Sequence, residues 1–175
     1  MRKIINSAFV SLDGVTADPA SWASGYFDQE AAQEAARALQ GYGAMLMGRG
    51  TYEYFAADMP TQTGPYADAI NAIPKYVFSA TLESADWNNS TIIRDDVVAA
   101  VNDLKQQDGG DLVIYGHGRL SQTLLSHRLV DELRFSVFPL LLGQRTAGGG
   151  NGQTLPLTLV GATPYSSGVV VLAYA

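Results

Sequence analysis

Short, almost continuous apolar segments alternate with helix-forming segments along most of this chain. The apolar segments predict strands at 4–12, 44–47, 75–79, 90–93, 111–115 and 132–138, and the segments between them predict helices at 28–40, as two short helices within 52–73, and at about 95–107 and 120–127. Strands that are apolar along their whole length are typical of a mainly parallel sheet with helices on both faces. The pattern therefore predicts an α/β fold with three layers.

The C-terminal part of the chain lacks this alternation. Two strand-like segments, 157–161 and 169–174, are joined by a turn region containing Pro164 and Gly168, with no helix between them. This connection predicts an antiparallel edge to the sheet, and the glycine-rich segment 147–152 before it is expected to be a mobile loop. A chain of 175 residues, 47% of them apolar, is long enough for one full core, which predicts a single domain over 1–175.

Charge and cysteine content exclude several classes of function. Charged residues make up 16% of the chain, the net charge is −6, and the 11 lysines and arginines are scattered, so we expect no nucleic-acid partner. The absence of cysteine excludes disulfides and cysteine-containing zinc sites, and two histidines make a poor metal cage, so we expect no metal site. Neither a signal peptide nor a membrane-spanning run is recognisable, so we expect no membrane association and a cytoplasmic location.

Two glycine turns follow predicted strands and precede predicted helices. Gly48-Arg49-Gly50-Thr51 comes after 44–47, and Gly116-His117-Gly118 comes after 111–115. In an open α/β sheet, ligands bind beyond the carboxyl ends of the strands, where helix N-termini offer free N–H groups to anions. Each turn taken alone can be simple chain geometry, and neither matches the Rossmann or P-loop pattern. Together they suit the pyrophosphate of a dinucleotide.

The order of several motifs resembles the dihydrofolate reductase superfamily. Those motifs are SLDG ending at Gly14, GRGTYE starting at Gly48, KYVFS starting at Lys75 and followed by Thr81-Leu82, LVDEL starting at Leu129, and the closing SGVVVL from Ser167. Within the superfamily, the chain is most similar to the reductase domain of bacterial riboflavin biosynthesis and to its stand-alone relatives. The likeness covers nearly the whole chain.

This resemblance implies a dihydrofolate-reductase-like three-layer fold and NADPH as the cofactor. It implies that the two glycine turns hold the pyrophosphate, that the region of Ser79 lies near the adenosine, and that the strand end at Asp13 borders the nicotinamide and the substrate. The candidate cofactor-binding residues are Gly48, Arg49, Thr51, Ser79, Thr81, Gly116, His117, Gly118 and Leu120.

Three positions depart from the family's usual pattern. Ala80 stands where many relatives have arginine, which leaves NADH open; Gly116-His117-Gly118 replaces a commoner Gly-Ser; and 144–150 replaces a segment that usually brings a Leu-Phe pair. The resemblance implies hydride transfer to a small heterocyclic or carbonyl substrate, either as 5-amino-6-(5-phosphoribosylamino)uracil reduction in the riboflavin pathway or as an orphan reaction. The alternative is a non-catalytic module that binds a nucleotide or another small ligand on the same fold.

Two early carboxylates are the candidates for the reacting end of the site. Asp13 ends the first strand, and Asp28 begins the first helix where dihydrofolate reductases have a substrate-binding carboxylate. An ionised Asp cannot donate a proton directly, so it would position a water or a substrate N–H. The alternatives are ordinary turn chemistry for Asp13 and a helix N-cap for Asp28.

An apolar run near the predicted sheet edge suggests self-association. It comprises Phe135, Val137, Phe138 and Leu140 to Leu142. Because long apolar edges invite pairing and are usually covered, we expect a homodimer. The alternative is that the run is a buried central strand.

Overall fold

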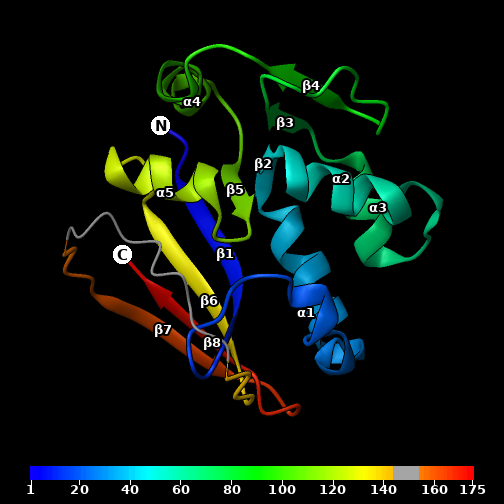
Figure 1. Cartoon of the computed structure of the whole chain (residues 1–175), viewed down its shortest axis with the longest axis vertical. Helices are drawn as coiled ribbons and strands as arrows, with labels where there is room; N and C mark the ends of the chain where they lie inside the picture. The colour runs from blue at the N-terminus through cyan, green and yellow to red at the C-terminus, as the bar shows by residue number, and fades with distance from the viewer. Residues whose placement is uncertain (144–153) are drawn as a thin grey trace.

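The computed structural model describes residues 1–143 and 154–175 and contains one eight-stranded sheet with helices packed against it (Figure 1). The strands are β1 Ile4–Ser11, β2 Tyr42–Gly48, β3 Lys75–Phe78, β4 Ser90–Ile93, β5 Asp111–Tyr115, β6 Glu132–Phe138, β7 Leu159–Pro164 and β8 Val170–Tyr174. The helices are α1 Gln29–Gln40, α2 Arg49–Asp58, α3 Pro65–Ala72, α4 Val97–Gln106 and α5 Arg119–Ser126, with short 3-10 turns at Pro19–Ser21, Ser24–Tyr26 and Met59–Thr61. Within these residues, no helix is long and apolar enough to cross a membrane.

The strand order is β4-β3-β2-β5-β1-β6-β8-β7. The pairs from β4 to β6 are all parallel, whereas β8 pairs antiparallel with both β6 and β7. The predicted three-layer α/β fold with an antiparallel C-terminal edge is therefore confirmed. The predicted mobile loop at 147–152 and the unusual segment 144–150 lie outside the described residues.

The core contains one large apolar cluster on each face of the sheet and a third, smaller cluster of Ala23, Phe138 and Val169. On β2, Ala44 and Leu46 belong to the cluster beneath α4 and α5, whereas Met45 and Met47 belong to the cluster beneath α1, α2 and α3. Successive strand residues point to opposite faces, so a strand covered on both sides is apolar along most of its length instead of at alternate positions. This is the physical reason for the uninterrupted apolar runs in the sequence.

The C-terminal strands differ from expectation in two ways. The strand predicted at 157–161 spans Leu159–Pro164 instead, so Pro164 ends β7, and Gly168 adopts a left-handed φ of 86° in the turn before β8. The premise for a dimer is also wrong, because β6 lies between β1 and β8 and is not an edge. Phe138 of β6 is 4% exposed and packs against Phe9. Among the described residues, the edge strand at this end of the sheet is β7.

The centre of the sheet contains a topological switch point. Strands β2 and β5 are adjacent and parallel, yet the helices that follow them lie on opposite faces. Tyr52 of α2 packs into one apolar cluster and Leu124 of α5 into the other. In open α/β sheets, ligands bind at such a position, in the crevice where segments of the chain leave neighbouring strands toward opposite faces.

Candidate functional site

Helices α2 and α5 begin on the two sides of this crevice without a side chain to cap them. Their N-cap residues are Gly48 and Gly118, and neither helix start has a side-chain hydrogen bond to its first N–H groups. By contrast, Asp28 caps α1 and Asp96 caps α4. The first N–H groups of a helix need acceptors and carry its positive dipole end, so the starts of α2 and α5 are suited to bind an anion.

The two glycine turns approach each other closely. Gly116 has a left-handed φ of 86°, and a Cβ atom on it would lie 3.9 Å from Oγ1 of Thr51. A Cβ on Gly48, Gly50 or Gly118 would meet nothing within 4 Å among residues 1–143 and 154–175, so these backbone segments face open space there. The turns that the sequence paired in one site are therefore neighbours, and their backbones are accessible to a ligand.

Arg49 is held in place at the rim of the crevice. Its Nε donates to Oε1 of Glu53 at 2.7 Å and its Nη1 donates to Oγ1 of Thr81 at 3.0 Å. The Ser79 hydroxyl accepts from the backbone N–H groups of Thr81 and Leu82, which fixes the loop that carries Thr81. The candidate residues after β2 and after β3 thus form one hydrogen-bonded group. Leu120, by contrast, packs against the apolar core beneath α5.

The second turn is fastened by a residue that the sequence argument missed. Asn6 of β1 is fully buried, and its Nδ2 donates to the carbonyl oxygen of Gly116 at 2.6 Å. Its Oδ1 lies 3.0 Å from Nδ1 of His117. Burial lowers the pKa of His117, which favours the neutral ring. An asparagine at the centre of a mostly apolar strand is the sequence signal that could have pointed to such a role.

Asp13 joins the end of β1 to the segment after β6. Its carboxylate accepts from the Ser11 hydroxyl at 2.6 Å and from the backbone N–H groups of Leu142 and Gly143 at 3.1 and 2.8 Å. These hydrogen bonds lower the pKa of Asp13, first through Ser11 and then through the two N–H groups. The group is therefore ionised at neutral pH and acts as a hydrogen-bond acceptor.

Asp28 is the N-cap of α1, with its carboxylate accepting from the N–H of Ala31 at 2.9 Å. The exposed side chain lies at the start of α1, on the same edge of the sheet as the end of β1. Beside it, a hollow of about 350 Å³ lies between the starts of α1 and α3. The residues that line this hollow are uncharged: Gln29, Ala32, Gln33, Met59, Gln62, Thr63, Gly64, Pro65, Tyr66 and Ala67.

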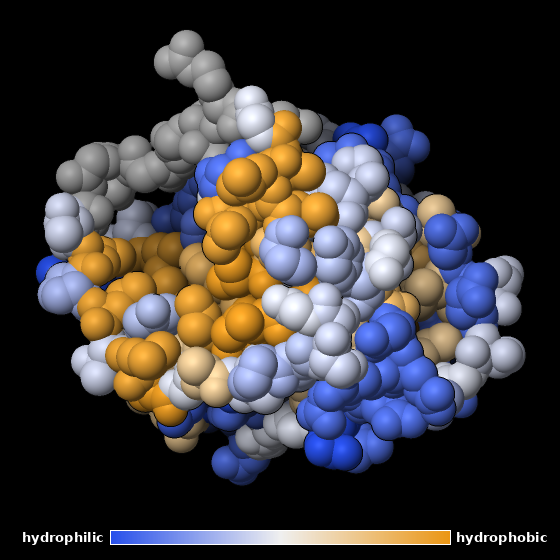
Figure 2. All heavy atoms as spheres, turned by 90° about the horizontal axis from the view of Figure 1, so that it is seen from below, coloured by the Kyte–Doolittle hydropathy of each residue, from blue (hydrophilic) through white to orange (hydrophobic). Residues whose placement is uncertain are grey.

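The end of the molecule at which β1 and β6 finish is rich in exposed apolar side chains. Leu12 is 64% exposed and Leu141 is 75% exposed, and the Leu12 N–H donates to the carbonyl of Leu140 at 2.9 Å. Figure 2, which views the molecule from below Figure 1, shows hydrophobic residues gathered in one broad patch. The Asp13 hydrogen bonds therefore hold an apolar rim beside the end of β1.

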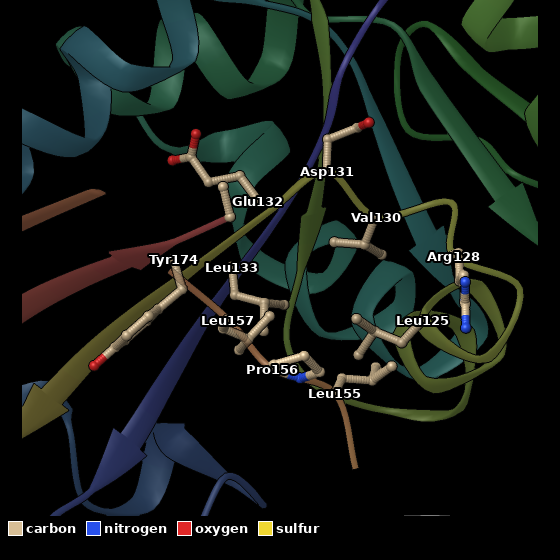
Figure 3. Close-up of a pocket in the computed structure, with 11 residues that line it drawn as sticks. Leu125, Arg128, Val130, Asp131, Glu132, Leu133, Leu155, Pro156, Leu157 and Tyr174 are labelled. Atoms are coloured by element: carbon tan, nitrogen blue, oxygen red, sulfur yellow. The ribbon is translucent and has the colours of Figure 1, made fainter. Parts of the chain in front are cut away.

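A second hollow, of about 150 Å³, lies at the opposite ends of the strands, near the start of β6 (Figure 3). It is bordered by Leu125 of α5, by Leu133 near the start of β6, and by the segment Leu155 to Leu157. None of the candidate site residues lines it. We therefore assign it no part in the site at the crevice.

The strand order, the antiparallel edge and the crevice between β2 and β5 define a dihydrofolate-reductase-like fold. The sequence narrows this class further. The chain belongs to the RibD C-terminal domain family, which matches residues 2–171.

Individual proteins are similar to this chain in sequence or in fold. The uncharacterized protein YyaP of Bacillus subtilis is 32% identical over 136 residues, which cover 74% of this chain and 72% of that protein. A putative riboflavin biosynthesis protein from Shewanella sp. PV-4 has a similar structure, with a TM-score of 0.75 at 20% identity over 98% of this chain and 97% of that one. A Thermotoga maritima diaminohydroxyphosphoribosylaminopyrimidine deaminase/5-amino-6-(5-phosphoribosylamino)uracil reductase gives a TM-score of 0.67 at 14% identity; the match covers 99% of this chain but 56% of that one.

Proposed function

We propose that this protein is an NAD(P)H-dependent reductase that transfers a hydride to a small heterocyclic or carbonyl substrate. The observation that carries the proposal is the pair of uncapped helix starts on adjacent strands, with Arg49 beside them. This combination of free N–H groups and a fixed guanidinium suits a pyrophosphate. The reduced nicotinamide would supply the hydride, and the protein would bind and orient both reactants.

Each part of the crevice has a role in this proposal. The N–H groups after Gly48 and Gly118, the Thr51 hydroxyl and the Arg49 guanidinium hold the pyrophosphate. The loop of Ser79 and Thr81 borders the adenosine. Ala80 is exposed and offers no cation to a 2′-phosphate, and NADPH is proposed ahead of NADH on the strength of the family.

The test is titration of the protein with NADPH and with NADH in a calorimeter, followed by assays of cofactor oxidation with a panel of heterocyclic and carbonyl compounds. Binding of either cofactor with turnover of one compound supports the proposal. Binding without turnover across a broad panel would favour the non-catalytic module. If neither cofactor binds, the proposed function is wrong.

We further propose that the substrate is not phosphorylated. Residues 4–36, which include the end of β1 and the start of α1, contain no lysine or arginine but five carboxylates, Asp13, Asp18, Asp28, Glu30 and Glu34. The hollow beside Asp28 is uncharged as well. A phosphate is bound by cationic side chains or by free N–H groups at a helix start, whereas this surface carries carboxylates and the start of α1 is already capped by Asp28. The panel should therefore pair each phosphorylated compound with its unphosphorylated form, and faster turnover of the phosphorylated one would contradict this point.

Asp13→Asn is expected to lower turnover by about 10²-fold while cofactor affinity stays unchanged. The reason is that Asp13 would position a water or a substrate N–H beside the nicotinamide, and asparagine has one acceptor oxygen in place of two. Asp28→Asn is the matched variant, because asparagine caps a helix as well as aspartate does. A loss confined to Asp28→Asn would transfer the role to that residue, and wild-type rates in both variants would exclude both carboxylates.

We also propose a homodimer, formed through the open edge of β7. Leu159 and Val160 are 54% and 57% exposed on this strand, and an edge strand carries unpaired N–H and C=O groups that can pair with the same strand of a second copy. Light scattering at micromolar concentration should give the mass of a dimer, and Val160→Lys should give that of a monomer. A monomeric wild type would end the proposal.

A further inference from the structure

The hydrogen bonds of Asn6 determine which way its side-chain amide points. Its Nδ2 donates to the carbonyl of Gly116 at 2.6 Å and lies 3.4 Å from the carbonyl of Ile114. Both partners are acceptors, so the amide nitrogen must face them. The amide oxygen, Oδ1, is consequently the atom that faces His117, 3.0 Å from its Nδ1.

The orientation of Asn6 in turn determines the tautomer of His117. An amide oxygen only accepts, so Nδ1 must carry the proton that is shared between the two side chains. In the neutral ring, Nε2 is then an unprotonated acceptor. Nε2 has no hydrogen-bond partner among the described residues and is not among their buried unsatisfied atoms. The ring contacts β1 and β6 next to the second glycine turn, so Nε2 can accept from a ligand that extends from this turn toward the end of β1.

The surroundings of His117 favour the neutral ring. The imidazole packs edge-on against Phe135 of β6, with centroids 5.4 Å apart at an angle of 83°. Neither Phe135 nor Asn6 of β1 titrates, and the nearest charged residue along α5 is Arg119, which is exposed. Burial is the cause that lowers the pKa of His117, and no nearby carboxylate among the described residues raises this pKa again.

We propose that Nε2 of His117 accepts a hydrogen bond from a hydroxyl or amide N–H of the bound dinucleotide. This inference rests on the proposed function. A pyrophosphate has no proton to donate at neutral pH, so the partner of Nε2 is a ribose hydroxyl or the nicotinamide carboxamide. His117 is then a positioning residue that orients the cofactor, and it is not a cation for the phosphates.

The tautomer can be tested without any cofactor. The ¹⁵N chemical shifts of the imidazoles in the free protein should show a protonated Nδ1 and an unprotonated Nε2 for His117. The sequence contains two histidines, so a spectrum of His117→Gln assigns the signals. A protonated Nε2 in the neutral ring would overturn the inference.

The hydrogen bond to the cofactor is tested by measuring NADPH affinity between about pH 8 and about pH 5.5. Protonation of Nε2 removes the acceptor, so wild-type affinity should fall relative to His117→Gln, whose amide oxygen accepts at every pH, as the pH drops toward the lowered pKa of His117. His117→Phe should bind about tenfold more weakly at pH 8. All affinities are compared as ratios to His117→Gln, which cancels the titration of the cofactor itself.

The outcomes separate the two proposals. If wild-type affinity rises on acidification relative to His117→Gln, His117 is a phosphate-binding cation and the inference is wrong while the proposed function stands. Wild-type affinity in His117→Phe would also reject the hydrogen bond. No NADPH binding at any pH would reject the proposed function and this inference with it, whatever the tautomer.

Discussion

Replacing Lys75 with methionine is expected to lower the free energy of unfolding by about 2–4 kcal/mol. Lys75 is 1% exposed at the start of β3, and its Nζ donates to the carbonyls of Asn71, Ile73 and Asn88 at 3.1, 2.8 and 3.0 Å. The ammonium also lies 4.2 Å from the centroid of the Trp87 ring. Methionine fills the space but leaves three carbonyls without this donor. The end of α3 and the segment before β4 would lose their common anchor.

The matched control is Lys3→Met, because Lys3 is exposed near the N-terminus. Exposed substitutions of this kind change stability by less than about 0.5 kcal/mol. Chemical denaturation of the wild type and both variants gives the comparison. A Lys75→Met protein as stable as Lys3→Met would show that the three hydrogen bonds of Lys75 contribute nothing net.

The same residue predicts how stability depends on pH. Burial lowers the pKa of Lys75 to about 8 in the folded protein, below its ordinary value of 10.5 in an unfolded chain. Between these two values the unfolded state binds more protons, so the free energy of unfolding should rise with pH, by up to about 1.4 kcal/mol per pH unit. Denaturation from about pH 7.5 to about pH 9.5 stays below the ordinary range of tyrosine. Lys75→Met should lack this rise, and a wild type that loses stability over the same interval would contradict the assignment.

Arg49→Ala is expected to weaken NADPH binding by about 1.5–3 kcal/mol, which is roughly 10- to 100-fold. Glu53 and Thr81 already hold the guanidinium, so the side chain is ordered before the ligand arrives. The remaining N–H groups of the planar fork have no partner among the described residues and can bind a phosphate oxygen. Calorimetric titration of both proteins measures the difference.

Two further variants sharpen this comparison. Arg37→Ala removes another surface arginine, which pairs with Glu34 at 2.9 Å on α1, and should leave NADPH affinity unchanged. Thr81→Val releases Arg49 from one partner without removing its charge, so its effect should be smaller than that of Arg49→Ala. Equal affinities for the wild type and Arg49→Ala would exclude Arg49 from the site.

Local sequence patterns predicted most elements of this fold because their causes are local. The uninterrupted apolar run from Ala44 to Met47 indicates a strand that is covered on both faces, whichever strands lie beside it. Its alternate residues pack into the two opposite clusters. Asp28 marks the start of α1 because an N-cap side chain accepts a hydrogen bond from a backbone N–H only two or three residues further along, here that of Ala31. The two glycine turns were recognisable for the same reason, since each depends on a strand, a turn and a helix in succession.

What a pattern of this kind could not predict is which strands are neighbours. The run from Phe135 to Phe138 has the composition of a covered edge, but β8 pairs beside it and makes β6 an interior strand. Nothing in the periodicity of β6 distinguishes these two cases, because both require apolar residues. The β7 edge became visible once the order of the whole sheet was known.

By itself, the sequence determined the α/β class, the antiparallel C-terminal pair and the two turns, all of which arise from side chains within a few residues of one another. Only the tertiary structure decided the contacts between distant residues. Asn6 meets His117 across 111 positions, Asp13 meets Gly143 across 130, and Lys75 bonds three carbonyls from two separate segments. These contacts depend on strand order, and strand order is set by how all the helices and strands pack around one core rather than by any local run of residues.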